Sequence, residues 1–112
     1  MQTKNRLHAL SLTLDLVRRL GPIVDRIERR DRDLGRQIRR AASSIALNLD
    51  EGNASDGGNR RARFVNALGS ARETRTALHL AAAWGYVAHD DLAALDRDLD
   101  RVAAMTFRLS RS

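Results

Sequence analysis

The sequence contains no cysteine, which excludes disulfide bridges and thiolate chemistry. We expect a protein of the reducing cytoplasm, where disulfides are rare. Only one of the 112 residues is proline and only four are aromatic, so alanine and leucine must supply most of the core. This composition favours helices over strands.

Long hydrophobic runs are also missing. The longest mostly apolar run covers 77–88, contains His79 and Gly85, and is too short for a bilayer core of about 30 Å. The first residues are polar, and charged residues interrupt the apolar positions that follow, so no signal peptide is predicted. We therefore expect a soluble cytoplasmic protein with no membrane partner.

Apolar residues recur at helical spacing in four segments, and no alternation typical of strands occurs. The predicted helices cover residues 5–29, 33–51, 60–84 and 90–110. The stretch 53–59 is predicted to be a turn from its composition. Because the connections are short, we predict an all-α, up-down-up-down four-helix bundle that forms a single domain over 1–112.

The expected core positions follow from the same spacing. In the first helix the three-four seam consists of Leu7, Leu10, Leu14, Val17, Val24 and Ile27. In the second helix the inward positions are Leu34, Ile38, Ala41, Ile45 and Leu49. The pair Gly21-Pro22 interrupts the first seam, and we expect a kink there rather than a break.

The second predicted helix also carries a small, partly polar stripe. Ser44 and Asn48 lie one turn apart on this stripe, which Gly52 extends. These polar side chains could not be buried unpaired, so a closely packed helix should offer hydrogen-bonding partners. The segment 67–73, which is again small and has Ser70 at its centre, is the candidate partner.

The charged residues are mostly arginine. The net charge is +6, with 19 arginines and a single lysine. Such a balance raises the expectation of an anionic partner, RNA or DNA first. The alternative is a general preference for arginine combined with a solvated helix surface.

One basic cluster is expected at the end of the bundle that gathers both chain ends and the connection between the second and third helices. Its basic members are Lys4, Arg6, Arg60, Arg61, Arg63, Arg108 and Arg111, against Asp50, Glu51 and Asp56. Three of the arginines, Arg60, Arg61 and Arg63, should lie in the first turn of the third helix. A glycine-rich turn before a helix N-terminus with three arginines predicts a phosphate site. The alternative is a solvated turn.

A second cluster surrounds the start of the second helix. Its members Arg36, Arg39 and Arg40 share a face and have no acidic residue between them, so they are the better candidates for contacts with backbone phosphates. Few aromatic residues accompany either cluster, and base stacking is therefore not indicated. Binding should be electrostatic and sensitive to salt.

Catalytic and metal-binding patterns are scarce. The three histidines lack metal-ligand spacing, so we expect no metal and no cofactor. Arg72 and His79 resemble the arginine–histidine pair of HEPN-type ribonucleases, in which the arginine stabilises phosphate charge and the histidine is an acid or base. Glu73 could neutralise Arg72, and a half-buried His79 on the bundle face is the simpler interpretation. We expect a protein with no catalytic residues and no enzymatic activity.

The second and third predicted helices resemble a four-helix bundle family encoded in intervening sequences of bacterial large-subunit ribosomal RNA genes. In the second helix the matching residues are Arg39, Arg40, Ala41, Ser44, Ile45, Asn48, Glu51 and Gly52. In the third helix and beyond they are Phe64, Leu68, Gly69, Ser70, Glu73, Gly85 and Tyr86. The sequence departs from the family pattern at Ala46, where proline is usual, and at Asp50, where a small residue is common.

This resemblance implies a homopentamer arranged as a barrel around a central channel, with no enzymatic activity. Similar proteins are accessory factors (accessory variability determinants) of diversity-generating retroelements, where a basic pentamer binds a reverse transcriptase and nucleic acid. The resemblance implies structural or assembly roles for Ser44, Asn48, Glu51, Gly52, Gly69, Ser70 and Glu73. The alternative function is a pure protein-interaction scaffold, in which the arginines make ion pairs between protomers.

Overall fold

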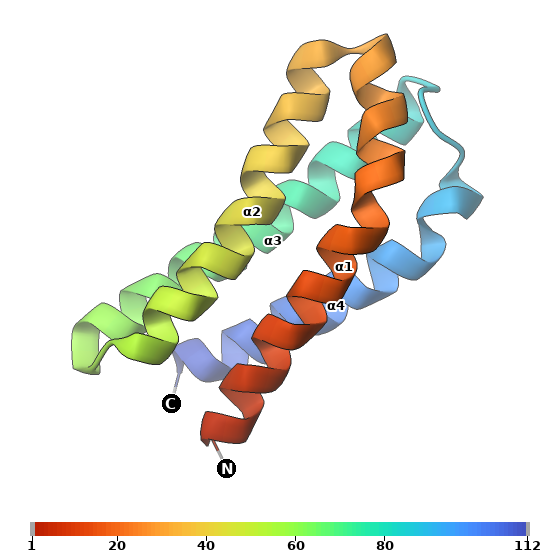
Figure 1. Ribbon diagram of the computed structural model, residues 1–112. Helices are drawn as coiled ribbons and strands as arrows, with labels where there is room; N and C mark the ends of the chain where they lie inside the picture. Colours follow the sequence, from red (N-terminus) through yellow and green to blue (C-terminus); the bar gives the residue numbers. More distant parts are fainter. Residues whose placement is uncertain (1, 112) are drawn as a thin grey trace.

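The computed structural model describes residues 2–111, with side chains from residue 4 onward. It contains four helices, α1 (Gln2–Arg30), α2 (Arg32–Ala54), α3 (Gly57–Ala83) and α4 (His89–Ser110), and no strand within that range (Figure 1). Each helix runs antiparallel to the next, and α1 packs against α4 to close the bundle. The predicted all-α, up-down-up-down four-helix bundle is confirmed.

The connection between α2 and α3 is shorter than predicted. The expected turn over 53–59 is wrong, because only Ser55 and Asp56 separate the two helices. The Ser55 hydroxyl donates to the Glu51 carbonyl at 2.7 Å and its backbone N–H donates to the Gly52 carbonyl at 3.3 Å, which ends α2. α3 then begins at Gly57, whose φ of +54° is a conformation that glycine adopts without strain.

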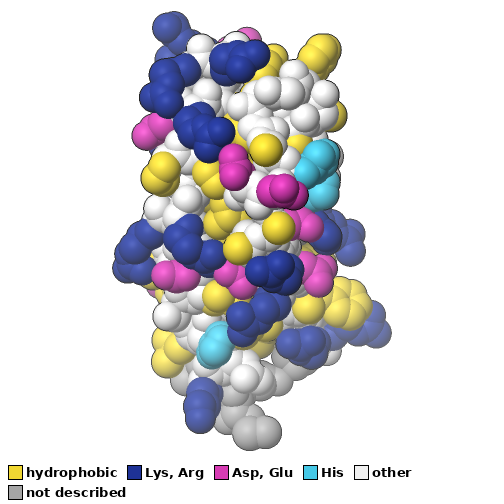
Figure 2. Space-filling model, turned by 90° about the vertical axis from the view of Figure 1, so that its right-hand side faces the viewer, with side chains coloured by type: hydrophobic (Ala, Val, Ile, Leu, Met, Phe, Trp, Pro, Cys, Tyr) yellow, Lys and Arg dark blue, Asp and Glu magenta, His cyan; other side chains and the backbone are white. Residues whose placement is uncertain are grey.

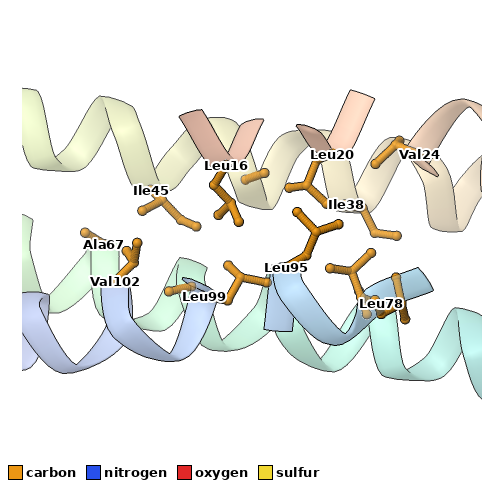
Figure 3. Packing of buried hydrophobic residues seen from close by; sticks show 14 of the residues in the cluster. Leu16, Leu20, Val24, Ile38, Ile45, Ala67, Leu78, Leu95, Leu99 and Val102 are labelled. Atoms are coloured by element: carbon orange, nitrogen blue, oxygen red, sulfur yellow. The ribbon is translucent and has the colours of Figure 1, made fainter. Parts of the chain in front are cut away.

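The core lies between the four helices and is almost entirely aliphatic. Figure 3 shows Leu16 and Leu20 of α1 facing Leu95 and Leu99 of α4 in the centre of the bundle. All five inward positions predicted for the second helix are buried, which confirms that part of the pattern. α1 continues without interruption through Pro22, so the predicted absence of a break is also confirmed.

The N-terminal half of α1 presents a different stripe to the core than predicted. Leu7 and Leu14 have exposed fractions of 59% and 43%, so their expected inward placement is wrong. The buried stripe instead runs through Ala9, Thr13, Leu16 and Leu20. It then continues through Val24 and Ile27, whose predicted burial is confirmed. Thr13 can be buried because its hydroxyl donates to the Ala9 carbonyl at 2.8 Å. The helix therefore has two apolar stripes, and the bundle buries the one that contains the threonine.

Membrane crossing is not supported by any helix in the described range, since none combines the necessary length with the necessary apolar character.

Candidate nucleic-acid interface

A row of arginines runs along the outer face of α2. Arg32, Arg36 and Arg40 are exposed and lie four residues apart, which corresponds to about 6 Å of helix rise per step. Within the described residues, none of the three makes an ion pair or a side-chain hydrogen bond. We call these three residues the α2 arginine row. It includes two of the predicted nucleic-acid contacts, Arg36 and Arg40, and adds Arg32.

Arg39 does not belong to this row, because carboxylates of α1 pair with it. Its guanidinium pairs with the carboxylate of Asp25, and its Nε lies 3.5 Å from Glu28 Oε2. Both carboxylates come from α1, which runs antiparallel beside α2. The spacing of residues within α2 does not show which α1 side chains lie beside it. The ion pairs of Arg39 therefore could not be predicted from the α2 sequence alone.

The predicted phosphate site at the start of α3 is only partly formed. Because α3 begins at Gly57, only Arg60 lies in the first turn, and the expected place of Arg61 and Arg63 there is wrong. Arg60 Nη2 lies 3.7 Å from Asp56 Oδ1, and its Nε donates to the Gly52 carbonyl at 3.3 Å. Arg63 Nε lies 2.9 Å from Glu51 Oε2. Acidic partners therefore offset the charge of two of the three arginines.

Arg61 is the exception in this group. It is exposed and has no ion-pair partner among the residues that the structure describes. Figure 1 places the α2–α3 connection at the same end of the bundle as both chain ends, as predicted. The α2 arginine row ends 14 residues before the end of α2, or about 20 Å along the helix axis. The two basic groups therefore do not form one patch.

Charge is mixed over much of the surface. In Figure 2, Lys and Arg side chains are spread along the whole face shown, with Asp and Glu between them in the upper and middle parts. Pairing of this kind on exposed helices contributes roughly 0–1 kcal/mol to stability. The exposed arginines that make no ion pair within the described residues are better placed to attract an anion than those that do.

The small, polar stripe of α2 meets the segment of α3 that the sequence pairs with it. Ser70 Oγ donates to Ser44 Oγ at 2.8 Å across the two helices. Asn48 Nδ2 donates to Ser44 Oγ at 3.0 Å and to the Ser44 carbonyl at 2.9 Å. Thr74, which is fully buried, donates to the Ser70 carbonyl at 2.8 Å. These bonds pair the polar side chains of Ser44, Asn48, Ser70 and Thr74 and give them a structural role within the chain.

The remaining residues of the family pattern have different surroundings. Gly52 is buried under the ring of Phe64, where a Cβ atom would lie 2.6 Å from Phe64 Cε1. Gly69 is exposed, and a Cβ atom there would have nothing within 4 Å. Glu73 is exposed and pairs with no cation in the described range. Gly69 and Glu73 therefore have no packing role among the residues that the structure describes.

A polar cluster joins α3 to α4, and the spacing of residues within either helix does not predict it. Arg75 binds both oxygens of Asp96, at 2.8 Å and 3.1 Å, and lies 3.2 Å from Asp100. His79 Nε2 lies 2.7 Å from Asp96 Oδ1. The hydrogen bonds from Arg75, and to a lesser extent that from His79, hold the pKa of the Asp96 carboxyl below its usual value.

This cluster bears on the ribonuclease interpretation. His79, whose side chain is half exposed, is bound to Asp96 of α4. Arg72 makes no ion pair in the described part of the chain, and its expected neutralisation by Glu73 is not observed. Nor do the described residues contain a group of histidines and carboxylates that could hold a metal ion. The contact with Asp96 gives His79 a structural role between α3 and α4.

Comparison with known proteins supports the fold and identifies the family. The model of the 23S rRNA-intervening sequence protein family matches residues 6–108. A crystal structure from Bacteroides thetaiotaomicron, described as a protein with unknown function from the S23 ribosomal protein family, is similar with a TM-score of 0.87. The two chains are 16% identical, and the similarity covers 96% of this chain and 99% of the other. No curated protein matches the sequence. The chain therefore belongs to the 23S rRNA-intervening sequence protein family.

Proposed function

We propose that this protein is a non-enzymatic, homo-oligomeric bundle that binds the phosphate backbone of RNA or DNA. The observation that carries the proposal is the α2 arginine row, with three exposed guanidinium groups on one helix face and no acidic partner among the described residues. Arginine binds phosphate oxygens through a planar fork of N–H donors. The net charge of +6 favours the encounter with a polyanion.

The side chains on the outer face of α2 indicate how the protein would bind nucleic acid. The helix contains no aromatic residue, so its outer face offers no aromatic ring on which bases could stack. Its arginines can contact phosphates, which position a protein on nucleic acid without reading the sequence. Binding should therefore weaken steeply as salt concentration rises, because counterion release supplies most of the free energy.

The experiment compares charge reversal in the row with the same reversal elsewhere. We expect the double variant Arg36→Glu, Arg40→Glu to bind a mixed-sequence RNA roughly tenfold or more weakly, and to reduce the slope of log K against log salt by about 2 for a duplex. The matched control is Arg18→Glu, Arg97→Glu, which changes the net charge equally at two exposed arginines without acidic partners in the described range. Fluorescence anisotropy at low and moderate salt measures both quantities.

Three results would contradict the proposal. The first is the absence of RNA and DNA binding by the unmodified protein at low salt. The second is equal weakening by the two double variants, because the row would then contribute only total charge. The third is loss of the oligomer in the row variant, which would favour the alternative scaffold function, in which these arginines pair between protomers.

Self-association is the second part of the proposal. The outer stripe of α1 exposes Leu7 and Leu14, with Leu10 and Val17 half-buried beside them. Contiguous apolar stripes of this kind commonly mark protein interfaces, because covering them removes apolar area from water. The resemblance to the pentameric family members supports five copies, and the same resemblance adds a retroelement reverse transcriptase as a proposed partner.

Polar substitution of the outer stripe should therefore change the stoichiometry. We expect Leu7→Ser, Leu14→Ser to shift the protein from oligomer to monomer in native mass spectrometry, with the helical circular dichroism retained because both side chains lie outside the core. The control is Leu80→Ser, which replaces another exposed leucine, on α3. If the control dissociates the oligomer and the α1 variant does not, the interface lies elsewhere.

A further inference from the structure

A second apolar surface lies between α3 and α4, on helices other than those of the arginine row and of the outer α1 stripe. It is a shallow groove of about 370 Å³. Its apolar lining consists of Leu68, Ala71, Leu99, Ala103, Ala104 and Phe107. We call it the α3–α4 groove.

The shape of this groove suits another helix. Three of its six apolar residues are alanines, so the valley between α3 and α4 admits close approach of a third helix. Phe107 is 45% exposed, although most large apolar side chains of this protein are buried. A helix laid along the valley would cover this ring together with the half-buried Leu68. Both walls are helices with internally satisfied backbones, so strand addition is not available here.

The charges around the groove indicate the charge that a partner should carry. Arg75 forms ion pairs with Asp96 and Asp100, so these three charges offset one another. Arg72 lines the groove, is exposed, and has no ion pair within the described residues. The Arg111 guanidinium lies 5.4 Å from the centre of the Phe107 ring. Two arginines without acidic partners thus flank an apolar floor, which complements a partner that carries carboxylates.

We propose that the α3–α4 groove binds an amphipathic helix of a partner protein, with an apolar stripe seated on the floor and Glu or Asp residues on the flank that faces Arg72 and Arg111. This inference goes beyond nucleic-acid binding and does not depend on it. A second copy of this chain would offer the outer α1 stripe, but Lys4 and Arg18 lie one helical turn from Leu7 and Leu14, so that stripe would place like charges near Arg72 and Arg111, which is unfavourable. The occupant is therefore a different, acidic helix.

The test uses a defined probe. A fluorescein-labelled helical peptide of about 18 residues carries leucines at positions i, i+3, i+4 and i+7 and glutamates on the flanks. The control peptide has lysine in place of each glutamate. We expect the acidic peptide to bind the full chain at least about tenfold more tightly than the basic one, with affinity falling as salt rises.

A matched pair of variants locates the binding. Ala104→Glu adds bulk and a like charge in the groove at an exposed helical position, and we expect it to weaken binding of the acidic peptide roughly tenfold or more. Ala93→Glu makes the same change at an exposed position nearer the start of α4, outside the groove, and should leave binding unchanged. Amide chemical-shift changes should concentrate on the residues that line the groove.

Several outcomes would overturn the inference. Equal binding of the two peptides would show that charge does not select the partner. Equal effects of the two variants would show that the peptide does not bind in the groove. Dissociation of the oligomer by Ala104→Glu would assign the groove to a second copy of the chain. Loss of RNA binding without loss of peptide binding in Ala104→Glu would assign it to nucleic acid. None of these results bears on the α2 arginine row, which the variant Arg36→Glu, Arg40→Glu tests separately.

Discussion

Replacing Gly35 by alanine is expected to lower the free energy of unfolding by about 1–3 kcal/mol. A Cβ atom at this buried position of α2 would lie 2.7 Å from Glu28 Cβ and 2.8 Å from Glu28 Cα. The second of these is a backbone atom of α1, so relief requires the two helices to separate. The better helix propensity of alanine, roughly 1 kcal/mol, offsets only part of this cost. Urea denaturation followed by circular dichroism measures the change.

Gly69 supplies the matched control. It lies inside α3 and is exposed, and a Cβ atom added there would meet nothing within 4 Å. Gly69→Ala should therefore raise the free energy of unfolding by about 0.5–1 kcal/mol. Opposite signs for the two substitutions support the close approach of α1 and α2 at Gly35. Stabilisation by both would contradict it.

Gly52→Ala is expected to destabilise the protein by about 1–3 kcal/mol through a side-chain clash instead of a backbone clash. A Cβ atom at Gly52 would lie 2.6 Å from Phe64 Cε1 and 2.8 Å from Phe64 Cδ1. The Phe64 ring is only 1% exposed and cannot move into solvent without leaving the core. Removal of the ring in Phe64→Ala should cost about 3–5 kcal/mol.

A double-mutant cycle isolates this contact. In a Phe64→Leu background the clashing ring atoms are absent, so Gly52→Ala should cost less than it does in the unmodified protein. We expect a coupling free energy of about 0.5–3 kcal/mol between the two sites. Strictly additive effects would show that Gly52 is required for another reason. RNA binding by the cycle variants should remain unchanged, because neither residue lies in the α2 arginine row.

These contacts show how the family pattern divides between packing and surface. Ser44 and Ser70 form a hydrogen bond between α2 and α3, and Gly52 leaves room for the Phe64 ring. Arg40 of the same pattern is exposed on the outer face of α2 and is available to a partner. Most of the recognisable residues therefore specify how the bundle packs, which explains why the family is easier to identify than its ligand.

The candidate sites were predictable to different degrees. Arg36 and Arg40 could be selected because their spacing puts them on one helix face with no acidic residue between them. Arg39 and Arg63 met the same local criteria, but they pair with Glu28 of α1 and with Glu51 of α2 respectively. The α3–α4 groove was not predicted, because its lining is contributed by two helices whose relative register is not encoded in either alone.

The sequence by itself determined that the chain folds into four helices, because the spacing of apolar residues within each segment is that of an amphipathic helix. The short connections determined that consecutive helices are antiparallel. It also determined the buried face of α2, whose apolar stripe has no competitor. Only the tertiary structure decided which stripe of α1 is buried. Leu7 and Leu14 are exposed, and the stripe that contains Thr13 faces the core. It likewise decided which arginines are neutralised. The physical reason is that packing and ion pairing depend on neighbours from other helices, which local spacing does not contain.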